Sequence, residues 1–296
     1  MADAMLLVTA IIWGINVSVV KKGLEGISPL VFNAVRFSIA CVVMRVMIYA
    51  LGRRMEFTLR HLFMLVSLGL LGTTGYQFFF LQGLSRTTAG TAAVLLATTP
   101  AWTAAIGCLL RRDRVTSLGW LGVAISIAGA VCIVLGPGDG AGAEMAGSPI
   151  TGGLMIICSV ICWSTFTVLL RPFVRIYSPM MVTYICTLGG TVPLLFLAIG
   201  NLQSQDWAAI SGFSWASMVY SGVLAVAMGY FLWNWGLARL GSARTSVYAN
   251  LLMPVALLAA WLVLGESLSL LQWLGIFLAL VGVFLARHHS HPINDV

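Results

Sequence analysis

Duplicated aromatic residues are the side chains of this sequence best suited to bind a small molecule. Trp163 follows Trp13 by 150 positions, and Tyr230 follows Tyr76 by 154 positions. All four lie inside apolar segments, where a Trp or Tyr needs a partner for its polar hydrogen. Aromatic walls with a few polar contacts are typical of small-molecule sites. We therefore predict that these residues line a cavity; the alternative is that they only pack helices together.

Amides, hydroxyls and one cation complete the predicted cavity. Arg36 lies seven residues past Pro29 in an apolar segment. A charged side chain at that depth usually faces the interior of a helix bundle or an aqueous cavity. It either binds backbone carbonyls, which we favour, or receives a substrate carboxylate. The predicted substrate-binding residues are Trp13, Asn16, Asn33, Arg36, Tyr76, Gln77, Thr98, Thr99, Trp102, Trp163, Tyr230, Asn234, Tyr248 and Asn250.

Pro100 and Pro254 form another duplicated pair, 154 positions apart. A proline inside a helix removes a backbone hydrogen bond and clashes with the carbonyl four residues earlier. Paired interruptions in two halves of a chain point to a transport site. We predict a hinge or helix break at both prolines, with a simple packing kink as the alternative. The nearby Thr98 and Thr99 can instead bond their own helix backbone.

The segments that carry these residues belong in a lipid bilayer. The chain is 60% hydrophobic and 8% charged, whereas soluble domains carry about 25% charged residues. The net charge of +7 does not indicate nucleic-acid binding, because the basic residues lie singly or in short clusters between apolar runs. A membrane-spanning helix needs about 20 apolar residues. Ten segments qualify: 4–22, 29–51, 61–84, 89–110, 116–136, 151–171, 179–199, 213–237, 243–265 and 268–287. The predicted fold class is therefore an all-α integral membrane protein.

The ten predicted helices divide into two similar units of five. Residues 1–137 and 151–296 form the units, and residues 138–150 form an external linker. Trp120-Leu121-Gly122 recurs as Trp273-Leu274-Gly275, which supports a duplication. Because each unit has an odd number of spans, the second inserts upside down relative to the first. Inverted repeats of this kind are typical of secondary transporters, which bind a small-molecule substrate between the repeats.

The positions of Lys and Arg predict the orientation of the chain. Cytoplasmic loops are enriched in these residues. With a cytoplasmic N-terminus, the inner loops hold eleven of them and the outer loops hold three, namely Lys21, Lys22 and Arg86. We therefore expect both termini in the cytoplasm. The first apolar run lacks a cleavage site and matches a mid-chain segment, so it should remain as a helix.

The positions of the acidic, histidine and cysteine residues disfavour proton antiport, a metal or cofactor site, and an enzyme active site. All nine acids fall in loops, tails or helix ends, so a downhill or exchange mechanism is favoured over tight proton antiport. The six cysteines form no C-x-x-C motif, and no cofactor or metal site is predicted. An integral-membrane enzyme is disfavoured, because the helix-end acids Asp113 and Glu266 lack histidine partners.

Small residues recur every four positions on two predicted helices. Gly122, Ser126 and Ala130 lie on the fifth span, and Gly275 and Ala279 lie on the tenth. Such faces let membrane helices approach closely. They predict contacts either inside the monomer or in a homodimer; for the oligomeric state we favour a monomer.

Almost the whole chain resembles the EamA-type branch of the drug/metabolite transporter superfamily. The residues that carry the resemblance are Trp13, Pro29, Arg36-Phe37, Pro254, Gly265-Glu266, Gln272, Gly275 and Gly282. The resemblance implies ten helices as two inverted five-helix repeats around a central cavity, in a bacterial cytoplasmic (inner) membrane. It implies export of small metabolites, with aromatic or other apolar amino acids favoured, as in YddG-type exporters. A multidrug exporter of organic cations is the alternative. Cys186 occupies the place of Arg36 in the second half, so the site is not electrostatically symmetric.

Overall fold

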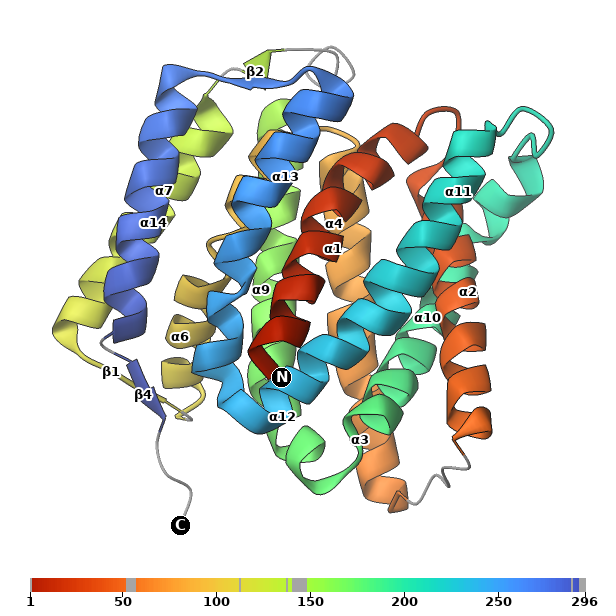
Figure 1. Ribbon diagram of the computed structural model, residues 1–296, viewed down its shortest axis with the longest axis horizontal. Coiled ribbons are helices and arrows are strands. Elements are labelled where there is room, and N and C mark those ends of the chain that lie inside the picture. Colours follow the sequence, from red (N-terminus) through yellow and green to blue (C-terminus); the bar gives the residue numbers. More distant parts are fainter. Residues whose placement is uncertain are drawn as a thin grey trace.

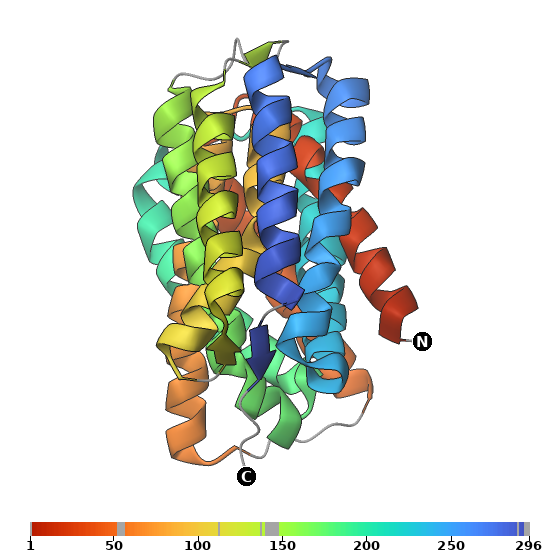
Figure 2. The ribbon, with the colours of Figure 1, turned by 90° about the vertical axis from the view of Figure 1, so that its left-hand side faces the viewer.

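The computed structural model describes residues 2–51, 57–111, 113–136, 138–139, 148–288 and 290–292. It is a bundle of helices that lie roughly along one direction (Figures 1 and 2). In the described part, eight helical segments are long and apolar enough to cross a membrane, and two shorter apolar helices follow. These ten spans confirm the predicted all-α membrane fold.

The spans follow the predicted order closely. Those of the first half are α1 (Ala2–Gly23), α2 (Pro29–Ala50), α3 (Leu59–Gly69) continuing into η1 (Leu70–Gly75) and α4 (Tyr76–Leu84), α5 (Ala89–Leu96) with α6 (Thr99–Leu109), and α7 (Ser117–Leu135). Those of the second half are α9 (Pro149–Ile176), α10 (Pro179–Ser204), α11 (Gly212–Tyr220) continuing into η2 (Ser221–Met228) and α12 (Gly229–Val247), α13 (Ala249–Leu264), and α14 (Leu270–His288). Of the predicted external linker, residues 140–147 lie outside the described part.

Hydroxyl side chains and prolines set where several spans begin. The side-chain oxygens of Thr58, Thr88, Thr116 and Ser211 each accept a hydrogen bond from a backbone N–H in the first turn of the following helix. This bond satisfies one of the donors that a helix start leaves unpaired. Helix α2 begins at Pro29 and α10 at Pro179, where the fixed φ of proline suits the first turn.

Two pairs of short strands join the connecting segments at the ends of the bundle. Strand β1 (Asp113–Val115) pairs antiparallel with β4 (Ser290–Pro292), and β2 (Gly138–Asp139) pairs antiparallel with β3 (Ser267–Leu268). The β2–β3 pair lies at the end of the bundle opposite both chain ends (Figure 1). An even number of spans requires both ends to lie on one side. Which side faces the cytoplasm remains a prediction.

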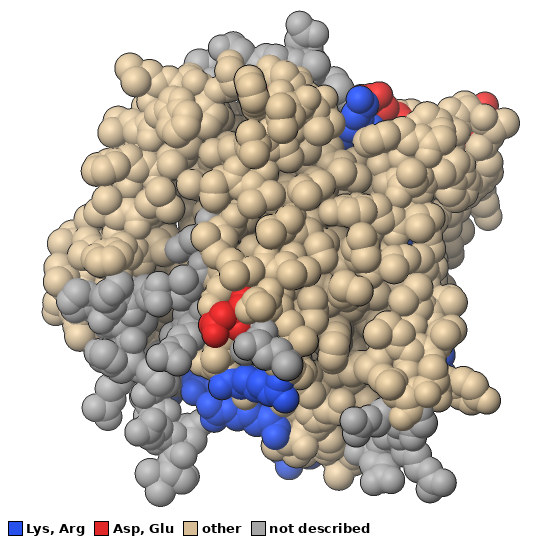
Figure 3. All heavy atoms as spheres, viewed as in Figure 1, with Lys and Arg blue, Asp and Glu red and all other residues tan. Residues whose placement is uncertain are grey.

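Charged side chains on the face seen in Figure 3 gather towards the two ends of the bundle. Between them lies a wide band of uncharged residues, and large apolar side chains such as Val42, Phe196 and Phe277 are more than half exposed. A surface of this kind suits contact with the hydrocarbon core of a bilayer.

Helices α7 and α14 lie side by side within the monomer (Figure 2). A Cβ atom added to Gly129 would come within 2.5 Å of the Ala279 backbone nitrogen, and one added to Gly282 within 2.3 Å of the Ser126 nitrogen. The small residues on these helices therefore make a contact within one chain, the first of the two predicted alternatives. Close approach gives the two helices many weak van der Waals contacts, which drive helix association in membranes.

We expect Gly129→Ala to lower the stability of the purified protein. The added methyl group meets backbone atoms that cannot move without separating α7 from α14, and overpacking of this kind costs about 1–3 kcal/mol. Thermal unfolding in detergent measures the effect. Gly200→Ala is the matched control, because no atom lies within 4 Å of a Cβ at that position. An equal unfolding temperature for both variants would refute the importance of this contact.

The two duplicated prolines differ in their effect on the backbone. The fourth span is interrupted, because α5 ends at Leu96 and α6 begins at Thr99, with Pro100 in its first turn. Helix α13 contains Pro254 without a break, which corrects the prediction for that position. The chain turns at Tyr248 instead, so Pro254 falls early in α13 and most of that helix stays intact. That either proline acts as a hinge remains a prediction.

Candidate functional site

One pocket lies in the middle of the bundle, where side chains from both halves of the chain meet. Helices α1, α2, α4, α5 and α6 supply one part of the wall, and α9, η2, α12 and α13 supply the other. The lining residues are Trp13, Asn16, Val17, Arg36, Tyr76, Gln77, Phe80, Leu96, Thr99, Val160, Trp163, Ala225, Val226, Tyr230, Trp233 and Leu252. The cavity volume is about 60 Å³. We therefore expect the pocket to enlarge around a substrate.

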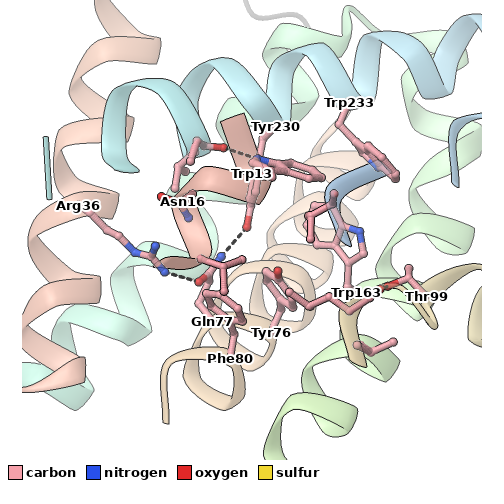
Figure 4. Close-up of a pocket in the computed structure, with 16 residues that line it drawn as sticks. Trp13, Asn16, Arg36, Tyr76, Gln77, Phe80, Thr99, Trp163, Tyr230 and Trp233 are labelled. Carbon is pink, nitrogen blue, oxygen red and sulfur yellow. Dashed lines mark hydrogen bonds between the residues drawn. The ribbon is translucent and has the colours of Figure 1, made fainter. Parts of the chain in front are cut away.

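Aromatic rings from both halves pack around this pocket (Figure 4). The ring centroid of Trp163 lies 5.8 Å from that of Trp13, 5.0 Å from Tyr76 and 5.1 Å from Tyr230. Trp233 lies 5.2 Å from Trp13. These separations fall in the range of favourable aromatic pairs. The four duplicated aromatic residues thus form one cluster with a fifth ring.

A hydrogen bond to a π-helix holds the indole of Trp13. Its Nε1 donates to the backbone oxygen of Ala225 at 2.8 Å. Ala225 lies in η2, and η1 occupies the corresponding place in the third span. A π-helix offsets the regular bonding pattern and often occurs at functional sites. The backbone oxygen of Ala225 in η2 is thus the hydrogen-bond acceptor for the partly buried indole of Trp13.

Arg36 anchors a polar network at one side of the pocket (Figure 4). Its guanidinium donates to Asn33 Oδ1, to Ser221 Oγ at 2.8 Å and to Gln77 Oε1 at 2.5 Å. Gln77 Nε2 then donates to the Tyr230 hydroxyl at 2.6 Å. Arg36 is 1% exposed, so these bonds replace water around its charge. The network joins the first half of the chain to Ser221 and Tyr230 of the second.

Eight of the predicted residues line the pocket, namely Trp13, Asn16, Arg36, Tyr76, Gln77, Thr99, Trp163 and Tyr230. The hydroxyls of Thr98 and Thr99 bond the carbonyls of Leu95 and Leu96, at 2.6 and 2.5 Å. Both hydroxyls therefore bond backbone carbonyls of their own interrupted span, which was the alternative prediction for Thr98 and Thr99. Thr99 reaches the pocket wall as well, whereas Thr98 does not.

Four other predicted residues do not line the pocket. Asn33 bonds Arg36 and the backbone oxygen of Gln77, and Trp102 packs against the apolar core. Asn234 donates to Thr183 Oγ1, and the Tyr248 hydroxyl donates to Asp3. The side chain of Asn250 lies outside the described residues.

Trp233 is the main lining residue that the sequence analysis missed. It lies three residues after Tyr230, and residues three apart share a helix face. That spacing could have identified it, because Trp13 and Asn16 show the same pattern. The apolar lining residues, such as Phe80 and Leu252, carry no signal that separates them from residues facing lipid.

The duplicated glycines Gly75 and Gly229 provide a matched test of the Trp13 position. A Cβ atom at Gly229 would lie 2.4 Å from Trp13 Nε1, whereas one at Gly75 would have no neighbour nearer than 3.5 Å. We expect Gly229→Ala to displace the Trp13 indole from Ala225 and to weaken ligand binding at least about fivefold, because one lost buried hydrogen bond costs about 1–3 kcal/mol. Gly75→Ala should leave binding within about twofold. Binding measured by thermal shift tests this, and equal affinities would contradict it.

The sequence profile of the EamA-like transporter family matches residues 1–135 and again residues 150–287. The chain belongs to the EamA-like transporter family. This membership confirms the resemblance drawn from the motifs. It also agrees with the prediction of a protein that is not an enzyme, because the family and its named relatives are transporters.

Relatives of this EamA-like protein match it along nearly their full length. The uncharacterized transporter YyaM of Bacillus subtilis is 25% identical over 284 residues, covering 95% of this chain and 92% of that protein. The probable terminal-alkyne amino-acid exporter of Streptantibioticus cattleyicolor is 27% identical over 285 residues, covering 96% and 93%. A solved crystal structure at 18% identity covers 96% of both chains with a TM-score of 0.64, which shows a shared fold.

Proposed function

We propose that this protein is a secondary transporter that exports small metabolites, most favourably amino acids with aromatic or other apolar side chains. The observation that carries the proposal is the aromatic pocket between the two halves, in which Trp13 and Tyr76 meet Trp163, Tyr230 and Trp233. An apolar side chain gains from burial among such rings. The name of the Streptantibioticus relative supports an amino-acid substrate.

Polar groups in the pocket favour a substrate with a carboxylate and an amine. Arg36 supplies a buried positive charge, and the described lining contains no Asp or Glu. Two lining atoms, Asn16 Oδ1 and Trp233 Nε1, are buried without a hydrogen-bond partner. They offer one acceptor and one donor to a ligand. An organic cation would bring a second positive charge near Arg36 with no acid to offset it.

Alternating access between two inverted repeats is the mechanism we propose. It is supported by the two matches to the family profile and by the π-helices η1 and η2 in corresponding spans. Each repeat would contribute one wall of the pocket, and relative motion of the repeats would open it to either side. We place the protein in a bacterial inner membrane as a monomer, with both termini in the cytoplasm.

Counterflow in proteoliposomes tests the proposed substrate class. Purified protein is reconstituted with one amino acid inside, and entry of a radiolabelled amino acid is followed for an aromatic, an aliphatic, an acidic and a basic member. We expect the fastest exchange for the aromatic or aliphatic members. Phenylalanine amide, which lacks the carboxylate, should compete poorly. Exchange of tetraphenylphosphonium without exchange of any amino acid would favour the multidrug alternative.

A further inference from the structure

Lys21 is a buried cation at the end of the bundle where β2 and β3 pair. It lies in the last turn of α1 and is 1% exposed. Its ammonium group donates to the backbone oxygens of Leu84 and Thr87, at 2.9 and 2.8 Å. The sequence analysis counted Lys21 only as an orientation signal in a loop. Burial removes the charge of Lys21 from water, which costs free energy. A role as an orientation signal does not explain this burial.

Glu266 is a buried acid at the same end, contributed by the other half of the chain. It is 5% exposed and lies in the turn between α13 and α14. Its two carboxyl oxygens accept bonds from the backbone N–H groups of Ala89 and Gly90, at 2.9 and 2.7 Å. These are the first residues of α5, where a helix offers unpaired donors. Glu266 also lies near enough to Lys21 for the two charges to interact.

These groups connect both halves directly above the pocket. Lys21 lies one helical turn beyond the lining residue Val17, and Leu84 lies one turn beyond the lining residue Phe80. Between them, the buried side chains of Val20, Leu81 and Ala93 belong to one continuous apolar cluster. A second bond across the halves runs from Gln272 Nε2 to Thr91 Oγ1 at 2.9 Å. Buried apolar side chains therefore occupy the helical turns between the pocket and this end of the bundle.

We infer that Lys21 and Glu266 are gate residues of the transport cycle, which hold the pocket closed at the predicted outer end and separate when it opens there. The inference rests on the proposed alternating access, because a gate has a role only if the pocket opens to both sides. The closed gate buries both charges against backbone partners, and the open gate returns them to water.

Buried charges suit a contact that must break repeatedly. The desolvation of both groups offsets much of the gain from their bonds, so the closed arrangement is not held too tightly. Removing Glu266 alone would leave the N–H groups of Ala89 and Gly90 unpaired, and Lys21 without its nearby acid, in the closed arrangement only.

Chemical labelling from each side of the membrane tests the gate. The reporter is Val17→Cys in a chain whose six native cysteines are replaced by alanine. A membrane-impermeant maleimide is added to right-side-out and to inverted vesicles. We expect Glu266→Ala to raise the labelling rate from the outer side at least about tenfold, the size expected for loss of a buried hydrogen-bond acceptor. Lys21→Met combined with Glu266→Met leaves the same N–H groups unpaired and should raise that rate as well.

Two neighbouring charges provide matched controls at the same end. Asp206 bonds only nearby backbone N–H groups, including those of Ala208 and Ala209, and Lys22 lies over the ring of Phe213. Asp206→Asn and Lys22→Met should leave the labelling rate unchanged. If Glu266→Ala does not fold, Glu266→Gln keeps one acceptor oxygen and should give a smaller rise in the same direction.

Equal labelling of the parent, Glu266→Ala and the double methionine variant, all folded, would overturn the inference and leave the two residues a purely structural role. The assay requires no substrate. A failure of the amino-acid panel therefore would not affect it, and a failure of the gate would not alter the result of the panel.

Discussion

Trp163→Ala is expected to reduce amino-acid exchange in proteoliposomes by at least tenfold. Trp163 lies at the centre of the aromatic cluster, within 6.3 Å of Trp13, Tyr76, Phe166, Tyr230 and Trp233 by ring centroids. Its loss removes the ring contacts that would enclose an apolar substrate side chain. Aromatic contacts in binding sites commonly contribute 2 kcal/mol or more, which exceeds a factor of about ten.

The comparison requires variants that separate binding from folding. Trp163→Phe keeps an aromatic ring and should retain most of the exchange. Trp163→Ala is a large-to-small change in a packed cluster, which also costs about 3–5 kcal/mol of stability. Thermal unfolding should therefore accompany each assay. Trp215→Ala is the matched control, because Trp215 is 40% exposed and stacks on Trp207 away from the pocket. Undiminished exchange by folded Trp163→Ala would remove this residue from the site.

Arg36→Gln is expected to impair both stability and transport, for every substrate. The variant leaves Ser221 and Gln77 without the donors they now have, and Gln77 in turn positions the hydroxyl of Tyr230. Each unsatisfied buried group costs about 1–3 kcal/mol. We therefore expect the unfolding midpoint to fall by roughly 5–10 °C, given about 2–4 °C per kcal/mol for a chain of this size class.

Conservative and control variants identify the role of Arg36. Arg36→Lys keeps the charge but offers three donors on one nitrogen, so it cannot reproduce the spread of bonds to Asn33, Ser221 and Gln77. It should remain well below the parent in stability. Arg45→Gln lies on the same helix at an exposed position and should change little. Normal stability of Arg36→Gln, with loss of exchange only for carboxylates, would assign Arg36 to substrate recognition instead of anchoring.

The duplicated aromatic residues lie together, as the sequence predicted, although their role in a binding site stays a prediction. Trp13, Trp163, Tyr76 and Tyr230 all line the pocket, and the indole nitrogen of Trp13 finds a backbone acceptor there. Arg36, a polar residue in an apolar segment, lines it as well. Asn33 met the same criterion but bonds the lining residues Arg36 and Gln77 from behind the pocket wall, and Trp102 packs against the apolar core. Depth along a helix limits where a side chain can lie, but the direction in which it points depends on packing.

The sequence by itself determined the ten helical spans and the chemistry available to the pocket, because long apolar runs and isolated polar residues have few stable solutions in lipid. The tertiary structure alone decided which atoms meet. It paired Arg36 with Ser221, placed Trp233 against Trp13, and brought Lys21 near Glu266. These partners are separated by more than a hundred residues, so their contact depends on how the two halves pack and not on any local pattern.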